Sequence, residues 1–469
     1  MADVADELVT SSAVTRGDLL RRGTAAAFAV SMFGGLADRA LGVRPLQFAH
    51  KQLSGELRIM TWAHFVPDYD KWLDGTYAKQ WGAENNVDVK IDHINNALLY
   101  STGAAEVAAQ SGHDLFWFIS PPASFQKQAI PVTDLVQEVS KKVGPMARVA
   151  RKATYNPKTK QFYGFPETYA PDPVQYRRSF LQEVGGSLRT WDDVRKAAPK
   201  LKGIGHPVGL GMSNEIDSNM LLTSLLYCYG GFIQNEENRI VIGQGANRKG
   251  AIQALEVMRD IYKNGMSDEV FAWTAASNNQ AFLAGRLSVA LNAISIARSA
   301  EDSGNSALSD DTWLASIPRG PAMRLGNEHV MGVYLIWKFA KNKEAARKYV
   351  VDQQLSYREH FIRSKYYNFP PWTGAIQGGF KAIRALTAQD AHKPKGKYTI
   401  LTTIAEKYTT NPGHPGNTTP VMDEIYNTFL IPQMFAEVAQ GKSSPADAVS
   451  AFASKANAIY RKWRDQKLV

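Results

Sequence analysis

Cysteine is the scarcest residue of this sequence. Only Cys228 is present among 469 residues, so an intramolecular disulfide is excluded. Cys228 lies in the apolar run NMLLTSLLYCYGG, residues 219–231. A thiol in such surroundings is typically a buried, inert side chain, and we do not expect it to act as a nucleophile.

The sequence also lacks the short motifs of common catalytic and metal sites. It contains no GxSxG elbow, no phosphate-binding P-loop, no HExxH pair and no DxDxDG calcium loop. Residues 203–211, GIGHPVGLG, have a glycine spacing like that of dinucleotide sites, but Pro207 interrupts the turn and no long helix follows. We read this segment as a loop before a strand, and we expect no cofactor and no metal.

A dense basic block is missing as well. The net charge is +10, from 54 Lys and Arg against 44 Asp and Glu, and such an excess can indicate nucleic-acid binding. The basic residues are scattered, however, mostly over predicted helices that also carry acids. We therefore expect no nucleic-acid partner.

The apolar segment near the N-terminus, residues 23–37, is too short to span a hydrocarbon core of ~30 Å. It follows the basic stretch RGDLLRR, residues 16–22, which resembles a degenerate twin-arginine signal. A basic stretch before a short apolar one is typical of a signal peptide. We predict that residues 1–49 are a signal peptide and linker and that the mature protein is periplasmic or extracellular. No cysteine follows to make it a lipoprotein; an N-terminal helix of a cytosolic protein is the alternative.

Strands and helices alternate after Gly55. Residues 55–62, 87–95 and 113–120 have the apolar pattern of strands, and residues 70–83 and 97–112 have that of helices. This order predicts an α/β fold in which helices cover both faces of a largely parallel sheet. Ligands of such sheets bind beyond the carboxyl ends of the strands.

Two later helices have clear start signals. Thr190 precedes Trp191 and Asp193, a capping-box pattern, and Ser444 is followed by Pro445 at the first helical position. The last ~50 residues have an almost continuous helical periodicity.

Six segments, in this order along the chain, resemble the extracellular solute-binding proteins of ABC importers, in the carbohydrate-binding group that includes the maltose-binding protein family. No single segment is decisive, but together they cover most of the chain after Ser54. They are LRIMTWAHF (57–65), AAEVAAQSGHDLFWFI (104–119), YGFPETYAPDPVQYRRSFLQEVGG (163–186), RTWDDVRKAAPKL (189–201), QAFLAGRLSVALN (280–292) and VAQGKSSPADAVSAFASKANAIYRKW (438–463).

The resemblance implies a two-lobed, periplasmic-binding-protein-like fold whose lobes are joined by a hinge. It assigns residues 50–168 and 328–355 to the N-lobe and residues 172–325 and 375–469 to the C-lobe. The hinge crossings are then expected near residues 169–172, 326–328 and 356–374.

The resemblance also implies the function. We expect a monomeric receptor that performs no chemistry, binds a sugar or oligosaccharide between its lobes, and delivers it to the transmembrane subunits of an ABC permease. A secreted carbohydrate-active enzyme is the alternative from another class, although no motif proposes the pair of carboxylates that such an enzyme needs.

Two departures from the family pattern concern the ligand. The first lobe crossing has Arg177 and Arg178 where the family usually has Asn-Lys, and a later strand ends in residues 292–295, NAIS, instead of Asn-Gly-Pro-Trp. One sugar-stacking tryptophan is therefore missing. A polyol phosphate or a polyamine remains an alternative ligand, and the two arginines favour an anion if either faces the cleft.

A sugar site needs aromatic rings for the apolar face of the sugar and polar groups for its hydroxyls. In the N-lobe, Trp62, His64 and Phe65 follow the first strand. Trp117 and Phe118 point to opposite faces of the third strand, so at most one of them faces the cleft. The resemblance places Phe118 at the stacking position.

Further candidates follow from the ends of the strands and from the lobe crossing. Ser120 lies just beyond the third strand, and Asp114, at the start of that strand, is expected to bond to backbone and not to ligand. Glu167 and Tyr169 lie in the crossing segment, where Glu167 either accepts sugar hydroxyls or braces the hinge.

The C-lobe candidates lie in loops and at one strand end. Asn214 belongs to the polar loop MSNEIDSN, Trp273 to the loop DEVFAWTAASNN, and Asn292 ends a strand. Trp372 follows two prolines in the late hinge region, where we expect it to be rigid and exposed. Aromatic residues in loops are frequent in binding sites.

Overall fold

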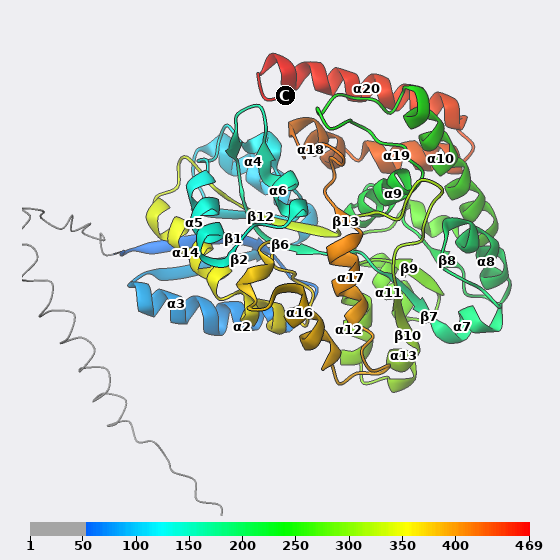
Figure 1. The fold of residues 1–469 in the computed structure, drawn as a ribbon, viewed down its shortest axis with the longest axis horizontal. Coiled ribbons are helices and arrows are strands. Elements are labelled where there is room, and N and C mark those ends of the chain that lie inside the picture. Colours follow the sequence, from blue (N-terminus) through cyan, green and yellow to red (C-terminus); the bar gives the residue numbers. More distant parts are fainter. Residues whose placement is uncertain (1–52) are drawn as a thin grey trace, which may run out of the picture. The chain divides into compact units, whose positions relative to one another are not determined.

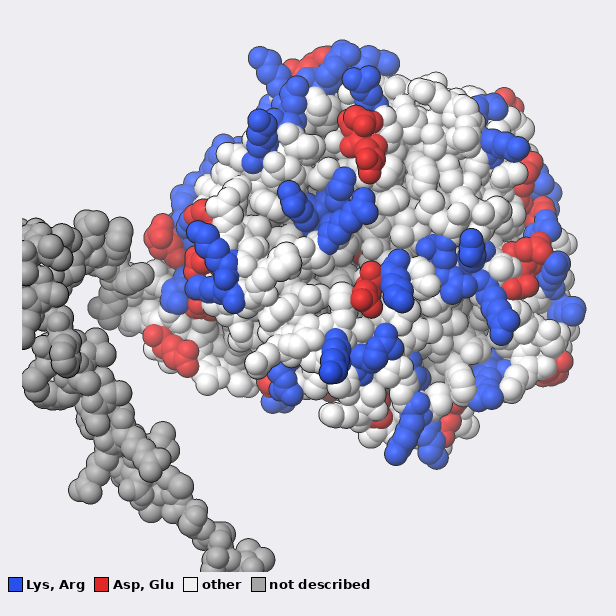
Figure 2. Space-filling view, in the orientation of Figure 1, with Lys and Arg blue, Asp and Glu red and all other residues white. Residues whose placement is uncertain are grey.

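The computed structural model describes residues 53–469, and the predicted signal peptide lies outside the described residues. Within the described part, no helix is both long and apolar enough to cross a membrane. On the face shown in Figure 2, basic side chains lie in separate groups with acidic side chains among them. This distribution agrees with the scattered charge of the sequence.

The first sheet contains the three strands predicted near the N-terminus, which are confirmed (Figure 1). Its order is β2-β1-β3-β12-β6; β1 runs parallel to β2 and β3, and β12 runs antiparallel to β3 and β6. The strands are β1 (Glu56–Trp62), β2 (Asp88–Ile94), β3 (Leu115–Phe118), β6 (Phe165–Ala170) and β12 (Val330–Ile336).

Helices cover both faces of this sheet. The predicted helix over residues 70–83 is interrupted by the π-helical turn η1, which separates two α-helices. The elements are α2 (Pro67–Trp72), η1 (Leu73–Tyr77), α3 (Ala78–Asn85), α4 (Leu99–Ala109), η3 (Ala123–Phe125), α5 (Thr133–Val143), α6 (Arg148–Thr154), α14 (Lys343–Leu355) and α15 (Tyr357–Arg363).

The second sheet has the order β10-β7-β9-β8, in which β8 and β9 are parallel and β7 is antiparallel to β9 and β10. Its strands are β7 (Val174–Arg177), β8 (Val208–Gly209), β9 (Val289–Leu291) and β10 (Thr312–Ala315). Its helices are α7 (Arg178–Glu183), α8 (Trp191–Gly203), α9 (Ile216–Cys228), α10 (Gly245–Gly265), α11 (Ser277–Leu283), α12 (Ser295–Asp302), α13 (Ser306–Asp311), α18 (Pro420–Asn427), α19 (Leu430–Ala439) and α20 (Pro445–Asp465).

Several local predictions are confirmed. The Thr190 hydroxyl accepts the backbone N–H of Asp193 at 3.0 Å, and the Asp193 carboxylate accepts the backbone N–H of Thr190 at 3.0 Å, which completes the capping box of α8. The Ser444 hydroxyl accepts the backbone N–H of Asp447 and so caps α20. Within the glycine-rich segment 203–211, residues 204–207 form a loop that leads into β8. Cys228 is fully buried, and burial raises the pKa of its thiol.

Each sheet lies in its own hydrophobic cluster, and the chain crosses between the clusters three times. The first crossing is Pro171–Pro173, between β6 and β7, and the second contains Glu328 and His329, just before β12. The third follows α17 (Thr399–Lys407), the helix after α16 (Gly379–Ala388), and leads to α18. It contains β13 (Thr409–Thr410), which pairs with β11 (Gly326–Asn327). Ile383 of α16 and Leu401 of α17 pack in the first cluster, although the resemblance assigned residues 375–469 to the C-lobe.

Candidate ligand-binding site

Aromatic side chains from the ends of β1 and β3 form one wall of the candidate site. The indole rings of Trp62 and Trp117 are stacked, with ring centroids 5.2 Å apart and an angle of 10° between the planes. His64 and Phe65 contact Trp62 edge-on, at 4.9 and 5.5 Å between centroids. Tyr367, which the sequence did not suggest, contacts His64 at 4.9 Å. Four predicted residues therefore come together around Trp62, and one unpredicted tyrosine contacts two of them.

Gly332 of β12 makes room for Trp117. A Cβ atom at this glycine would lie 2.6 Å from the Trp117 indole nitrogen, and the register between β12 and β6 shifts at this position. The indole N–H donates to Glu167 of β6 at 3.3 Å, and Glu167 also accepts from the Tyr357 hydroxyl at 3.3 Å. Burial raises the pKa of Glu167 to about 7. The Glu167 carboxylate thus bonds to two aromatic side chains, and the choice between its two predicted roles stays a prediction.

His64 is held as a neutral ring. Its Nδ1 accepts the backbone N–H of Val66 at 2.8 Å, so its Nε2 carries the hydrogen and donates to the Asn368 side-chain oxygen at 3.1 Å. Burial lowers the pKa of His64 to about 4. The imidazole therefore offers no positive charge to a ligand near neutral pH.

Phe118 points away from this wall, as the alternation along β3 requires. Its ring packs against Phe116, Phe125 and Tyr100, with centroids 4.7, 5.4 and 6.3 Å away, on the face of the sheet that α4 covers. The family-based placement of Phe118 at the stacking position is therefore corrected. Trp117 is the side chain that lies beside Trp62.

The remaining N-lobe candidates occupy buried positions near the strand ends. Ser120 is buried in the loop after β3. Tyr169 is fully buried in β6 and packs against Phe369 at 5.9 Å between centroids. As expected, Asp114 bonds to backbone: it accepts the N–H groups of Arg58 and Asn342 at 3.0 and 2.8 Å.

The opposite wall is a cluster of buried amides around Asp217, at the start of α9. Asn292, after β9, donates to Asn279, Asn278 and Asp217 at 2.7, 3.1 and 3.3 Å. Asn278 donates to Asp217 at 2.9 Å, and Asn279 donates to the Ser295 hydroxyl at 3.0 Å. Ser295 occupies the position where the family usually carries a stacking tryptophan, so hydrogen bonding replaces an aromatic platform here.

His329, in the second lobe crossing, links this cluster to the first crossing. Its Nδ1 lies 3.1 Å from Asp172 of the first crossing, and its Nε2 lies 3.5 Å from Asp217. Burial opposes a charge on His329, but the two carboxylates outweigh it and raise the pKa of the imidazole. We therefore treat His329 as a cation held between two acids.

Three buried oxygen atoms at this junction have no hydrogen-bond partner among residues 53–469. They are Oδ2 of Asp172, Oδ1 of Asp217 and the hydroxyl of Tyr367. Burial, with the nearby charges of Asp217 and Asp172, raises the pKa of Tyr367. The tyrosine therefore joins the aromatic wall to the acidic one. We name this region the interlobe site, comprising Trp62, His64, Trp117, Asp172, Asp217, Asn278, Asn292, His329 and Tyr367.

Sequence reasoning missed most of the acidic wall. Asp217 lies at the start of α9, three positions after the predicted Asn214. Asp172 lies within the predicted crossing 169–172, and His329 directly follows the predicted crossing 326–328. An acid or histidine at a crossing is the signal that could have found Asp172 and His329, because such side chains lie between the lobes.

Asn214 and Trp273 lie together, but elsewhere on the C-lobe. They line a hollow of about 360 Å³ next to α19, and no residue of the interlobe site lines it. Trp273 packs over Gly209, where a Cβ atom would meet its ring at 3.0 Å. The structure thus separates these two candidates from Trp62 and Asn292.

The prediction that Trp372 is exposed is wrong. Its ring is fully buried against Phe165, 5.4 Å away, and its indole N–H donates to the Ser140 hydroxyl at 2.9 Å. The neighbouring Gly374 allows this, because a Cβ there would lie 1.9 Å from the Val143 carbonyl oxygen at the end of α5. The loop therefore closes onto α5, and Trp372 is part of the core.

Neither arginine of the first crossing faces the interlobe site. Arg177 pairs with Asp311 at 2.7 Å, and the guanidinium of Arg178 lies 3.9 Å from the ring centre of Trp313 on β10. Both side chains are engaged along the edge of the second sheet. The argument that they favour an anionic ligand is thereby removed.

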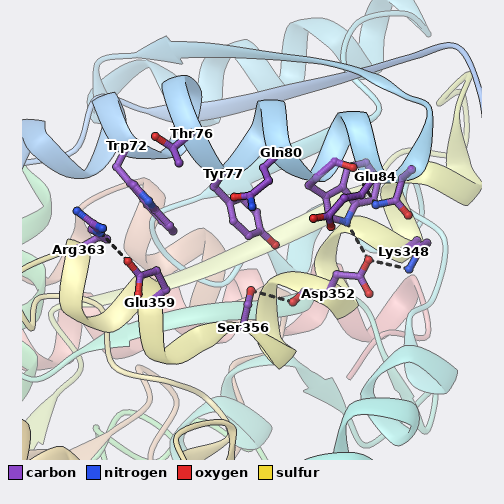
Figure 3. A pocket seen from close by; sticks show the side chains of 12 residues that line it. Trp72, Thr76, Tyr77, Gln80, Glu84, Lys348, Asp352, Ser356, Glu359 and Arg363 are labelled. Atoms are coloured by element: carbon purple, nitrogen blue, oxygen red, sulfur yellow. Dashed lines mark hydrogen bonds and ion pairs between the residues drawn. The ribbon is translucent and has the colours of Figure 1, made fainter. Parts of the chain in front are cut away.

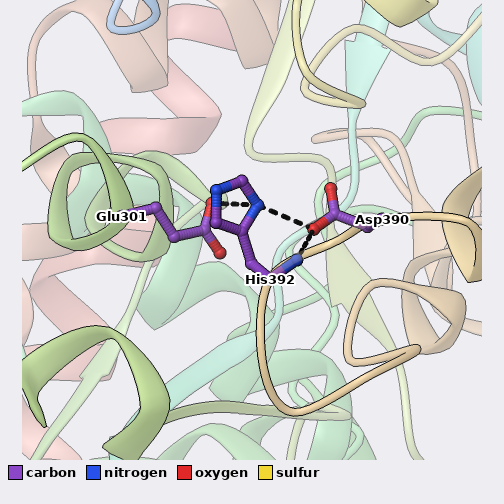
Figure 4. Close-up of side chains that lie close together, drawn as sticks. All are labelled: Glu301, Asp390 and His392. Atoms are coloured by element: carbon purple, nitrogen blue, oxygen red, sulfur yellow. Dashed lines mark hydrogen bonds and ion pairs between the residues drawn. The ribbon is translucent and has the colours of Figure 1, made fainter. Parts of the chain in front are cut away.

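Glu301, Asp390 and His392 lie close enough together to suggest a metal site (Figure 4). Arg298 pairs with Glu301 at 2.7 Å and with Asp390 at 2.9 Å, and Lys397 pairs with Glu301 at 2.6 Å. These buried cations already neutralise both carboxylates. The donor set therefore fits an ion-pair network and does not fit a divalent cation.

The family profile described as "Bacterial extracellular solute-binding protein" matches residues 76–352, more than half of the chain. No curated protein matches the sequence significantly.

Among solved structures, maltose-bound MalE3 of T. maritima is 16% identical, with a TM-score of 0.68 over 86% of this chain and 99% of that one. A solute-binding protein of Thermotoga lettingae bound to α-D-tagatose is 15% identical (TM-score 0.69; 87% and 99% covered). A sugar transporter of Arthrobacter chlorophenolicus A6 with laminaribiose is 17% identical (TM-score 0.67; 86% and 98% covered). These matches confirm the two-lobed α/β fold. The chain belongs to the family of bacterial extracellular solute-binding proteins.

Proposed function

We propose that this protein is an extracytoplasmic receptor of an ABC transporter that binds a sugar or oligosaccharide between its lobes and delivers it to the permease. The observation that carries this proposal is that an aromatic wall and an acidic wall meet in one site. Tyr367 contacts Trp62 and His64 of the aromatic wall and is influenced by the charges of Asp172 and Asp217, and three oxygen atoms of these groups lack a hydrogen-bond partner among residues 53–469.

The aromatic wall suits the apolar face of a sugar, and the acidic wall suits its hydroxyl groups. The rings of Trp62 and Trp117 offer an apolar surface to the C–H face of a pyranose. Oδ2 of Asp172 and the Tyr367 hydroxyl have no hydrogen-bond partner among residues 53–469, and Oδ1 of Asp217 has only His329 at 3.5 Å, so these oxygens can bond to hydroxyl groups. In a site that excludes water, each satisfied hydroxyl adds selectivity, because an analogue without it leaves a buried group unpaired. The sugars named for the similar solved structures, maltose, tagatose and laminaribiose, support this ligand class.

The charges of the site favour an uncharged sugar over the alternative ligands. Its acids are Asp172 and Asp217, and His329 is committed to both of them. Arg177 and Arg178 point elsewhere, so a polyol phosphate has no evident cationic partner among the residues of the site. A polyamine is the second candidate, because two carboxylates beside stacked indoles suit an ammonium group.

The mechanism is a shift between open and closed lobes without chemistry. In this structure the interlobe residues are buried, which corresponds to closed lobes. We propose that the lobes open about the three crossings, at 171–173, 328–329 and 408–419, and that ligand stabilises closure by bridging the two walls. The boundaries then follow the two hydrophobic clusters, with α16 and α17 in the N-lobe. We further propose a monomer that works in the periplasm or outside the cell.

A thermal-shift screen followed by calorimetry tests this proposal. The panel contains maltose, laminaribiose, tagatose and ribitol, with spermidine and glycerol phosphate as the competing classes. A bound ligand at a hundredfold excess over Kd stabilises the folded state by about 2.7 kcal/mol, which is easily seen. Saturable stabilisation by a sugar without turnover supports the receptor. Turnover of a bound sugar, or binding of the phosphate alone, contradicts it.

A further inference from the structure

A groove of about 760 Å³ lies on the surface of the N-lobe, between the helical segment α2–η1–α3 and the helices α14–α15 (Figure 3). Its volume falls within the ~300–1,000 Å³ of small-molecule sites. None of its lining residues belongs to the interlobe site. The groove is therefore a separate feature that the proposed function does not use.

One wall of the groove is aromatic because of the π-helical turn. Trp72 and Tyr77 are five positions apart, and the wider turn of η1 brings their rings to one face, with centroids 5.6 Å apart. Trp81 follows four positions later and donates its indole N–H to Asp352 at 2.8 Å. Three aromatic residues thus line the groove along about 14 Å of helix, at 1.5 Å per residue.

The facing wall is polar but nearly neutral. Lys348 pairs with Asp352 at 2.8 Å, and Arg363 pairs with Glu359 at 2.6 Å, so these four charges cancel. The Tyr77 hydroxyl, between the walls, has no hydrogen-bond partner among the described residues. Nucleic acid or another polyanion would need a net basic groove, which this pairing does not provide.

We propose that this groove is a second carbohydrate-binding site, which takes an extended, uncharged oligosaccharide on the outer surface of the N-lobe. Trp72 and Tyr77 provide stacking surfaces along its length. The ion-paired side chains of α14 and α15 provide donors and acceptors for hydroxyl groups on both sides of each ring. The open groove accepts a long chain, whereas the interlobe site encloses its ligand.

Native affinity electrophoresis tests this, with laminarin, soluble starch and xylan each cast into separate gels. These polymers are too long to be enclosed between the lobes. We expect at least one of them to retard the wild-type protein, and Trp72→Ala to weaken that polymer's apparent affinity at least tenfold. Because Trp72 packs on His360, 4.9 Å away, a thermal melt accompanies this variant. Thr76→Arg is the second variant, since it fills the groove from an exposed position.

The matched control is Trp313→Ala, which removes a tryptophan from β10 outside the groove and is expected to leave retardation unchanged. Asp217→Asn separates this inference from the proposed function, because it alters the interlobe site and not the groove. Polymer binding that survives Asp217→Asn but is lost in Trp72→Ala and Thr76→Arg supports the second site. No retardation by any polymer, or retardation that both groove variants retain, overturns it.

Discussion

The two walls of the interlobe site differ in the side chains that form them and in the protonation of the histidine that each contains. The N-lobe wall is aromatic, and its histidine, His64, is neutral because burial lowers its pKa to about 4. The opposite wall is acidic, and its histidine, His329, has a raised pKa because Asp172 and Asp217 hold it. Both histidines are buried, but only His329 lies between two carboxylates, and these neighbouring charges account for the difference. We propose that the aromatic wall recognises the shape of the sugar and that the acidic wall recognises its hydroxyl groups.

The largest effect is expected from Asp217→Ala, which breaks the acidic wall. This change leaves His329 with one acid and leaves Asn278 and Asn292 without their shared acceptor, so the free energy of unfolding should fall by about 3–5 kcal/mol. Denaturant unfolding measures it. Glu269→Ala, which breaks the exposed pair with Arg286, is the control and should cost no more than about 1 kcal/mol. Equal effects of the two variants would contradict the account.

The pH dependence of stability should differ between the two histidines. The folded-state pKa of His64 is about 4, below the usual 6.5, so its contribution is complete above pH 6.5 and is lost as the pH falls towards 4. The loss approaches about 3 kcal/mol, at 1.36 kcal/mol per pKa unit. His64→Gln keeps an acceptor and a donor but removes the titration. The difference in unfolding free energy between wild type and variant should therefore depend on pH in this window.

His329 should behave in the opposite way. Its raised pKa means that its contribution is complete below pH 6.5 and is lost as the pH rises through the folded-state pKa. NMR titration of the two ring signals checks both directions. Finding His329 neutral at pH 6 would show that the acids do not hold it as a cation.

Trp62→Leu tests the aromatic wall with less disturbance, because leucine fills part of the volume. We expect the affinity for the best sugar of the panel to fall roughly tenfold to a hundredfold, about 1.4–2.7 kcal/mol. Calorimetry measures it. An unchanged affinity would mean that the stacked indoles do not contact ligand.

The smallest effect on affinity is expected from Phe118→Leu. This side chain packs under α4, on the opposite face of β3 from Trp117, so the stability should fall but the sugar affinity should not. Comparison with Trp117→Leu distinguishes the two neighbours. If Phe118→Leu lowers affinity and Trp117→Leu does not, the family-based placement was right and the assignment from the structure is wrong.

The sequence predicts what local physics determines. The period of two in 113–120 places Trp117 and Phe118 on opposite faces, and the capping pattern locates the start of α8 at Thr190. Neither pattern tells which face of β3 α4 covers, because that depends on packing between distant segments.

The sequence did not predict the acidic wall, for the same reason. Asp172, Asp217 and His329 come from three segments that only the folded chain brings together. Trp372 was misjudged because its burial depends on the close approach of Gly374 to α5, which no local pattern shows.

The structure of the protein with the tightest sugar of the panel tests the central claim most directly. We predict a sugar ring on the Trp62–Trp117 side, with hydroxyl groups within hydrogen-bond distance of Oδ1 of Asp217 and the hydroxyl of Tyr367. A sugar seated instead in the hollow beside Trp273 and Asn214, with Trp62 and Asp217 untouched, would contradict it.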